Sequence, residues 1–142
     1  MYIKEFCRCC THCASGIVTD GVFELYCFID PQFLEVVDGT KIIEISTLDN
    51  NNFKIADKEK YLVKPLGRLR KGKRIFHDEF LLVGEIIELN GEDAVIRIGG
   101  LKIDAGTGIG MSNHFKIGDW VEFTADRLDA KICTDRLLPY KD

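Results

Sequence analysis

The chain has 142 residues, of which 46% are hydrophobic and 30% charged, with only three prolines. This composition is typical of one globular domain or two small ones, and it excludes a long disordered chain. The longest apolar runs are far too short to cross a membrane as a helix, and the first residues lack the apolar centre of a secretory signal. We therefore expect a protein of the reducing cytoplasm with no transmembrane segment.

A cysteine-rich run stands near the N-terminus. Four of the six cysteines and one of the three histidines lie within seven residues: Cys7, Cys9, Cys10, His12 and Cys13. Thiolates and imidazole are the ligands that zinc prefers in structural sites. The sequence therefore predicts a zinc-stabilised knuckle with Cys7, Cys10, His12 and Cys13 as metal ligands.

Other interpretations of this run stay open. Cys7, Cys10 and Cys13 have the C-x2-C-x2-C spacing of an iron–sulfur site, but Ile17 stands where the fourth cysteine belongs. The cysteines could also be free thiols or lipidation sites, and Cys27 or His77 could complete a metal shell. The alternation around Cys27 favours a core position for it instead. A metal-handling or redox function remains an alternative.

The first half reads as β-hairpins. Short segments with strand character flank turn dipeptides: Gly16–Thr19 and Val22–Ile29 around Asp20-Gly21, and Phe33–Val37 and Lys41–Leu48 around Asp38-Gly39. Such dipeptides favour the left-handed backbone of a tight turn. Asn50-Asn51-Asn52 is expected to end the second hairpin before a strand over Phe53–Ala56. Alternation places Leu25 and Cys27 on the core face of their strand, with Tyr26 and Phe28 opposite them.

A basic connector follows. It carries six positive and no negative charges within eleven residues: Lys64, Arg68, Arg70, Lys71, Lys73 and Arg74. The remaining residues then hold 13 basic and 23 acidic side chains. Clustered Arg and Lys are the electrostatic footprint of nucleic-acid binding, although a solvated connector has the same composition. Just before it, Asp57–Val63 is expected to form a short helix that ends at Pro65.

The second half reads as a meander. Strands are predicted over Leu81–Leu89, Ala94–Ile98 and Leu101–Ala105, separated by turns at Asn90-Gly91 and Gly99-Gly100. A crossing over Gly106–Ile117, with a short helix at Ser112–Lys116, leads to Trp120–Ala125. A turn at Asp126-Arg127 is then expected before a last strand, Leu128–Cys133. This order of elements is similar to that of an OB-type barrel.

The sequence thus predicts a mostly β protein of antiparallel meanders forming one or two small barrels, with an OB-like C-terminal half. We divide it into residues 1–63, a connector over 64–78, and residues 79–142. No spacing singles out a nucleophile and its base, so we expect no enzyme. The leading hypothesis is a module that binds nucleic acid, or an assembly containing it, through the basic connector. The main alternative is a protein–protein adaptor or inhibitor that docks on an acidic protein surface.

Overall fold

The structure is a computed structural model that describes residues 1–10, 13–30, 36–67, 69–71, 74–76, 79–106 and 111–132. Over these residues the chain is mostly β, with a single helical turn, α1 (Met111–His114). The strands are β1 (Tyr2–Cys10), β2 (Cys13–Thr19), β3 (Glu24–Asp30), β4 (Ile42–Ile55), β5 (Leu62–Pro65), β6 (Leu69–Lys71), β7 (Arg74–Phe76), β8 (Phe80–Asn90), β9 (Asp93–Ile98), β10 (Leu101–Gly106) and β11 (Trp120–Ile132). The mostly β class predicted from the sequence is confirmed.

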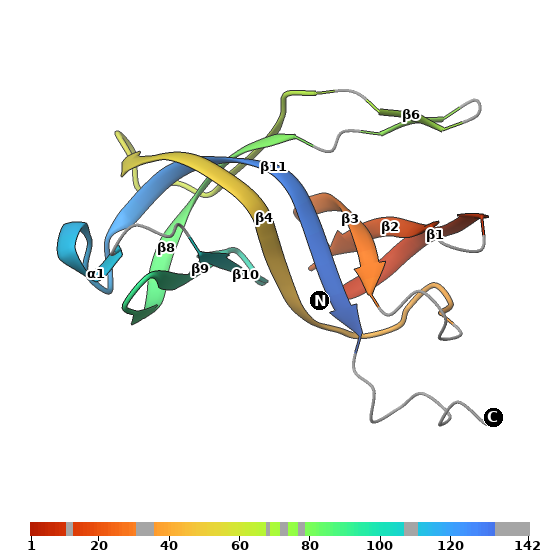
Figure 1. Ribbon diagram of the computed structural model, residues 1–142, viewed down its shortest axis with the longest axis horizontal. Coiled ribbons are helices and arrows are strands. Elements are labelled where there is room, and N and C mark those ends of the chain that lie inside the picture. The colour runs from red at the N-terminus through yellow and green to blue at the C-terminus, as the bar shows by residue number, and fades with distance from the viewer. Residues whose placement is uncertain are drawn as a thin grey trace.

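Two long, curved strands, β4 and β11, connect the two sides of the molecule (Figure 1). They pair antiparallel over most of their length, from Val121 opposite Ile55 to Ile132 opposite Ile42. Strands β8, β9 and β10 gather with α1 at one end of this pair, and β1, β2 and β3 gather at the other. We call these groups the C-terminal lobe and the N-terminal lobe.

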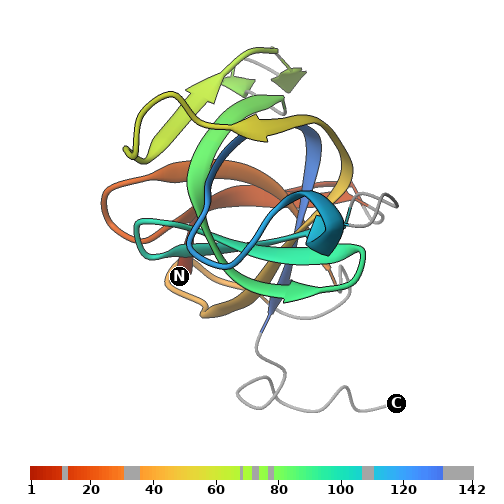
Figure 2. The ribbon, with the colours of Figure 1, turned by 90° about the vertical axis from the view of Figure 1, so that its left-hand side faces the viewer.

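The C-terminal lobe is a partial ring of strands, seen end-on in Figure 2. The meander β8–β9–β10 pairs antiparallel throughout, β8 pairs with the first half of β11, and β10 pairs parallel with β4. The β10–β4 contact consists of Ile103 opposite Ile45 and Asp104 opposite Ser46. Gly84 lets β8 and β9 approach closely, since a Cβ there would lie 2.7 Å from Ile96 Cγ2.

The N-terminal lobe is closed differently. Strands β1, β2 and β3 form a meander, and β3 pairs parallel with the second half of β11. Its other edge, β1, contacts the segment that leads into β4. There the Ile3 N–H donates to the Thr40 carbonyl at 3.0 Å, and the Gly39 N–H donates to the Ile3 carbonyl at 2.7 Å. The Ile42 N–H donates to the Met1 carbonyl at 3.0 Å.

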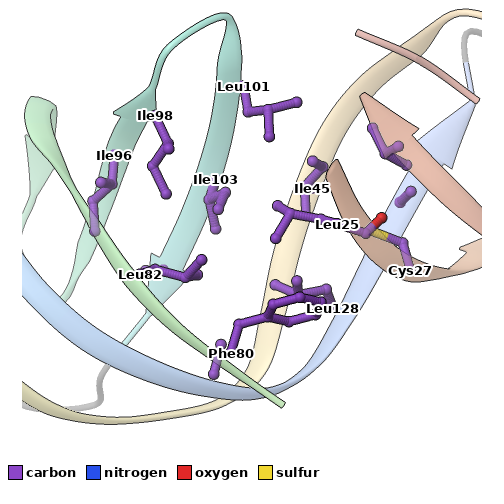
Figure 3. Packing of buried hydrophobic residues seen from close by; sticks show 14 of the residues in the cluster. Leu25, Cys27, Ile45, Phe80, Leu82, Ile96, Ile98, Leu101, Ile103 and Leu128 are labelled. Atoms are coloured by element: carbon purple, nitrogen blue, oxygen red, sulfur yellow. The ribbon is translucent and has the colours of Figure 1, made fainter. Parts of the chain in front are cut away.

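The buried apolar side chains of both lobes form one cluster (Figure 3). Alternation along β9, β10 and β11 directs every second side chain inward, as in the buried series Val121, Phe123 and Ala125. Cys27 belongs to this cluster and is fully buried, which confirms its predicted core position. The division at residues 64–78 stays a prediction, and strands from both sides of it pair in one sheet.

Three turns of the predicted chain path are confirmed. Hairpins form at Asp20-Gly21, Asn90-Gly91 and Gly99-Gly100, the first with a loop that extends to Phe23. A turn also forms at Asp38-Gly39, but its hydrogen bonds connect it to β1. The short helix predicted at Ser112–Lys116 is present as α1.

Three other predictions were wrong. The Asn50–Asn52 run does not end a strand: β4 continues through it, with Asn52 at a φ of 61° beside a register shift. Asn tolerates this left-handed backbone well, so a bulge bends the strand. Asp126-Arg127 is likewise a register shift inside a continuous β11. The residues over Asp57–Val63 form a bend followed by β5, not a helix. In each case pairing with a distant strand outweighs local preference.

Candidate nucleic-acid interface

The basic connector forms an extended antiparallel arm. Strand β5 pairs with the start of β8, from Leu62 opposite Val83 to Pro65 opposite Phe80. Beyond this pairing the Leu66 N–H donates to the Glu79 carbonyl at 2.8 Å. Strands β6 and β7 then form their own two-stranded sheet, which extends well away from the C-terminal lobe (Figure 1). We call residues 62–80 the arm.

Four of the six predicted phosphate-contacting residues lie in described strands of the arm: Lys64, Arg70, Lys71 and Arg74. Lys64 is exposed in β5. Arg70 stands opposite Ile75, and Lys71 stands directly opposite Arg74. Arg68 and Lys73 lie outside the described residues. Three of the six therefore lie on the two-stranded β6–β7 sheet, and Lys64 lies in the nine-stranded sheet where the arm begins.

An aromatic cluster lies where the arm meets the body. Tyr61, just before β5, has its ring centroid 4.8 Å from that of Trp120 and 6.2 Å from that of Phe23. All three rings are half-buried, and Phe23 comes from the β2–β3 loop of the N-terminal lobe. We call Phe23, Tyr61 and Trp120 the aromatic cluster. It presents ring surface beside the basic arm.

Tyr26, Phe28 and Trp120 differ in exposure and in the contacts that they make. Tyr26 is 4% exposed and belongs to the core, although it lies on the strand face opposite Leu25 and Cys27. Phe28 is half-buried beneath Arg127, whose guanidinium carbon lies 4.6 Å from the ring centroid. Trp120 is accessible, but its contact with Tyr61 could not be read from the sequence, because the two residues are brought together by long-range strand pairing.

Arg97 adds a cation next to the cluster. Its guanidinium pairs with the Glu85 carboxylate at 2.9 Å. The hydrogen bond to Glu85 and then the neighbouring Tyr61 raise the pKa of Arg97 above its already high value. The side chain therefore stays charged at every physiological pH.

A shallow pocket of about 310 Å³ opens beside Tyr61. Apolar side chains line part of it, and charged groups stand around them; the lining residues are Ala56, Asp57, Lys58, Lys60, Tyr61, Leu62, Val83 and Glu122. Glu122 is held in place by Lys54, with Nζ and Oε2 3.0 Å apart. Lys58 and Lys60 are exposed. The pocket thus combines an aromatic wall with cations at its margin.

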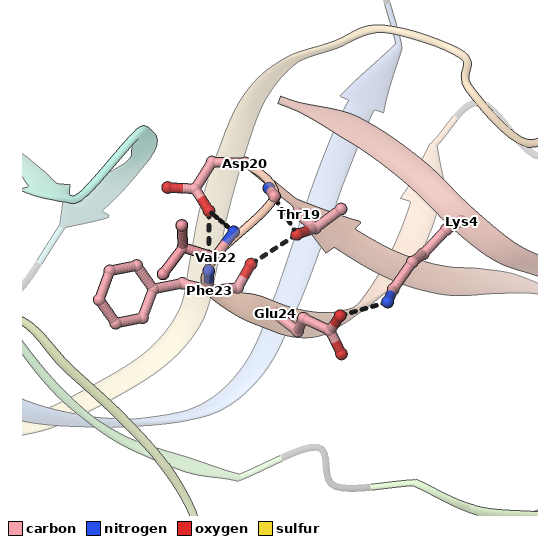
Figure 4. Close-up of polar contacts among 7 residues, drawn as sticks. Lys4, Thr19, Asp20, Val22, Phe23 and Glu24 are labelled. Atoms are coloured by element: carbon pink, nitrogen blue, oxygen red, sulfur yellow. Dashed lines mark hydrogen bonds and ion pairs between the residues drawn. The ribbon is translucent and has the colours of Figure 1, made fainter.

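Asp20 fixes Phe23 in the aromatic cluster (Figure 4). Its Oδ1 accepts hydrogen bonds from the backbone N–H groups of Val22 and Phe23, both at 2.8 Å. Its Oδ2 accepts from the Gly100 N–H at 2.6 Å, which connects the two lobes. Partial burial opposes ionisation, but these backbone donors outweigh it, and the pKa of Asp20 lies below its usual value. A charged Asp20 therefore positions Phe23 against the C-terminal lobe.

The cysteine-rich run lies at the end of the β1–β2 hairpin. Cys7 stands opposite Ser15, and Cys10 stands opposite Cys13. His12 lies outside the described residues. Among the residues that the structure describes, no group of three potential metal ligands is found. Burial raises the pKa of the Cys27 thiol, and a negative charge at Asp129 raises it further, so this thiol stays protonated within the core.

Comparison of the chain with models of protein families, with curated protein sequences and with solved structures finds no match. Over the described residues, no helix has the length and apolar character needed to span a membrane.

Proposed function

We propose that this protein is a non-enzymatic module that binds nucleic acid through its basic arm. The observation that carries the proposal is the placement of Arg70, Lys71 and Arg74 on the two-stranded β6–β7 sheet, with Lys64 in β5 at the base of the arm. Lys and Arg contacts to phosphates supply most of the non-specific affinity of proteins for nucleic acid, double- or single-stranded. The acidic remainder of the chain disfavours contacts on surfaces far from this arm.

The strand pairings also support an OB-like description of the C-terminal lobe. An OB fold is a five-stranded Greek-key barrel with a meander of three strands. Here β8, β9 and β10 supply the meander and β11 follows the crossing, as expected from the sequence. The fifth position is taken by β4, which precedes the meander in the chain. We propose an OB-like barrel in which the fifth strand comes from the N-terminal half.

Zinc at the end of the β1–β2 hairpin is a further part of the proposal. Opposed positions on an antiparallel pair bring Cβ atoms to about 4.5–5.5 Å, a separation that two thiolates of one tetrahedral site can bridge. Cys10 and Cys13 hold such positions, with Cys7 and His12 nearby in the chain. Elemental analysis of the purified protein should give about one zinc per chain. Iron with visible absorbance would contradict this assignment.

The arm is tested by reversing two of its charges. Binding of a mixed-sequence oligonucleotide should weaken steeply with salt, with a log–log slope of up to about −5 if six phosphates are contacted. The Arg70→Glu/Lys71→Glu variant should lose most of the affinity and reduce the slope by about 2. The control is Lys41→Glu/Lys116→Glu, which reverses two exposed lysines outside the arm. Equal binding by both variants would refute the proposal.

The same basic ribbon could dock on an acidic protein, as the alternative from the sequence holds. Affinity purification after nuclease treatment distinguishes the two. Recovery of one stoichiometric acidic protein, together with no oligonucleotide binding, would favour the adaptor or inhibitor function.

A further inference from the structure

We infer that the nucleic acid bound by this protein is single-stranded, with one unstacked base held in the pocket beside Tyr61. This inference builds on the proposed function and names its substrate class. It depends on three features that meet at the base of the arm: the aromatic cluster, the pocket and the exposed lysines of the segment that precedes β5.

The aromatic cluster has the chemistry that single strands require. Proteins that bind single-stranded nucleic acid stack bases on aromatic side chains along a basic groove, and this stacking tolerates any sequence. Tyr61 and Trp120 are half-buried, so each is anchored by packing and still presents ring surface. In a duplex the bases are already stacked on one another, and their faces are unavailable to such rings.

The pocket has the size and lining for one planar heterocycle. Its volume of about 310 Å³ lies at the lower end of the range for small-molecule sites. Tyr61, Leu62 and Val83 supply an aromatic and aliphatic lining. The Glu122 carboxylate, although paired with Lys54, retains acceptor sites for the amino groups on the edge of a base. A base pair is too wide to enter this space.

Basic side chains recur from the pocket margin into the arm, although the exposed Asp57 and Glu59 alternate with Lys58 and Lys60. Lys58 and Lys60 are exposed at the pocket margin, and Lys64 is exposed in β5, directly along the chain. Strand residues advance about 3.3 Å each, so the path from Tyr61 to Arg70 is at most about 30 Å. A single strand of several nucleotides could place one base in the pocket and its phosphates along the arm. The geometry thus joins a base-binding site to a phosphate-binding ribbon.

The chain offers a direct optical test. Trp120 is its only tryptophan, so quenching of tryptophan fluorescence reports on the aromatic cluster alone. A 12-nucleotide single strand and the duplex of the same sequence are titrated into the full-length protein. We expect the single strand to quench Trp120 and to bind at least tenfold more tightly than the duplex.

Two pairs of variants locate the site. Tyr61→Ala should weaken single-strand binding about tenfold or more and leave duplex binding unchanged, whereas Tyr61→Phe, which keeps the ring, should bind as the unmodified protein does. Lys60→Glu should also weaken single-strand binding, and it alters an exposed side chain without disturbing the core. Lys116→Glu, on an exposed lysine that follows α1, is its matched control.

The outcomes separate this inference from the proposed function. If single strand and duplex bind equally, and Tyr61→Ala and Lys60→Glu change neither, the inference is wrong. The proposed function then still stands if Arg70→Glu/Lys71→Glu abolishes binding. If neither oligonucleotide binds the unmodified protein, both are wrong. Should Tyr61→Ala fail to fold, Lys60→Glu and the Trp120 signal decide the question.

Discussion

The two lobes share β4 and β11 but are closed in different ways. In the C-terminal lobe, β8 and β11 pair over six consecutive positions, from Trp120 opposite Glu85 to Ala125 opposite Phe80. In the N-terminal lobe, β1 reaches the start of β4 through the bridge between Tyr2 and Lys41 and a few backbone hydrogen bonds. Local opening is easiest where few backbone bonds must break. We therefore expect the N-terminal lobe to open first between β1 and the start of β4, whereas the corresponding weak point of the C-terminal lobe is the short β10–β4 contact.

The largest loss of stability should come from truncating a core side chain of the C-terminal lobe. Phe123 is fully buried in β11, and its ring stacks on Phe53 at a centroid distance of 4.6 Å. Phe123→Ala should lower the free energy of unfolding by about 3–5 kcal/mol, because it leaves a cavity that neighbours fill incompletely. Urea denaturation measures this loss. Ile117→Ala, at a side chain 62% exposed, should change little.

A core change in the N-terminal lobe should have a more local result. Leu25 is fully buried in β3. Leu25→Ala should lower the free energy of unfolding of the N-terminal lobe by about 2–5 kcal/mol. We expect hydrogen exchange to show lost amide protection over β1–β3 while β8–β10 remain protected. Equal loss of protection in both lobes would show that they open as one unit, and the comparison would fail.

The hydrogen bonds of Asp20 at the junction between the lobes should contribute less to the free energy of unfolding. Asp20→Ala removes the acceptor for Val22, Phe23 and Gly100, and we expect a loss of about 1 kcal/mol, since water replaces part of these bonds. Because the folded-state pKa of Asp20 is lowered, its contribution is complete above its unfolded pKa of about 3.9 and is lost as pH falls through the folded pKa.

Urea midpoints of the unmodified protein and Asp20→Ala should therefore differ at pH 7 and converge in acid. Asp126→Ala, at an exposed carboxylate in β11, is the control. A difference that persists unchanged at low pH would assign the effect to packing of Phe23 rather than to the charge.

The smallest effect should come from the surface ion pairs, of which each lobe has a cross-strand example. Lys4 pairs with Glu24 in the N-terminal lobe, and Arg97 pairs with Glu85 at 2.9 Å in the C-terminal lobe. Exposed pairs of this kind are screened by water and salt. Double-mutant cycles should give coupling close to the error of measurement in both lobes. A large coupling for Arg97 alone would indicate that Tyr61 is part of the interaction.

Local signals predicted local structure well in this chain. The meander of β8, β9 and β10 was predictable because Asn90-Gly91 and Gly99-Gly100 demand tight turns, and Gly99 adopts a φ of 61°. The continuity of β4 and β11 was not predictable, since each strand is stabilised by the other across more than sixty residues of sequence. Residues with strong turn preferences, such as Asn52, lie in bulges within these strands instead of ending them.

The candidate site likewise contains residues that the sequence predicted and residues that it did not. The basic residues of the arm were visible as a run of charges, whereas Tyr61 and Phe23 gave no signal as isolated aromatics. They became a site because Asp20 holds the β2–β3 loop against Gly100. Zinc binding by Cys7, Cys10, His12 and Cys13 stays a prediction.

The long antiparallel pairing of β4 with β11 has a consequence for the nascent chain. Residue 55, the end of β4, leaves the ribosome 65 residues before β11 begins at Trp120. At the usual rate of synthesis, roughly 3–13 s pass before β11, the strand that pairs along β4, begins to be made. During that interval an apolar strand edge is available to neighbouring chains. A truncation before residue 120 would leave it so permanently, and we expect such a product to aggregate.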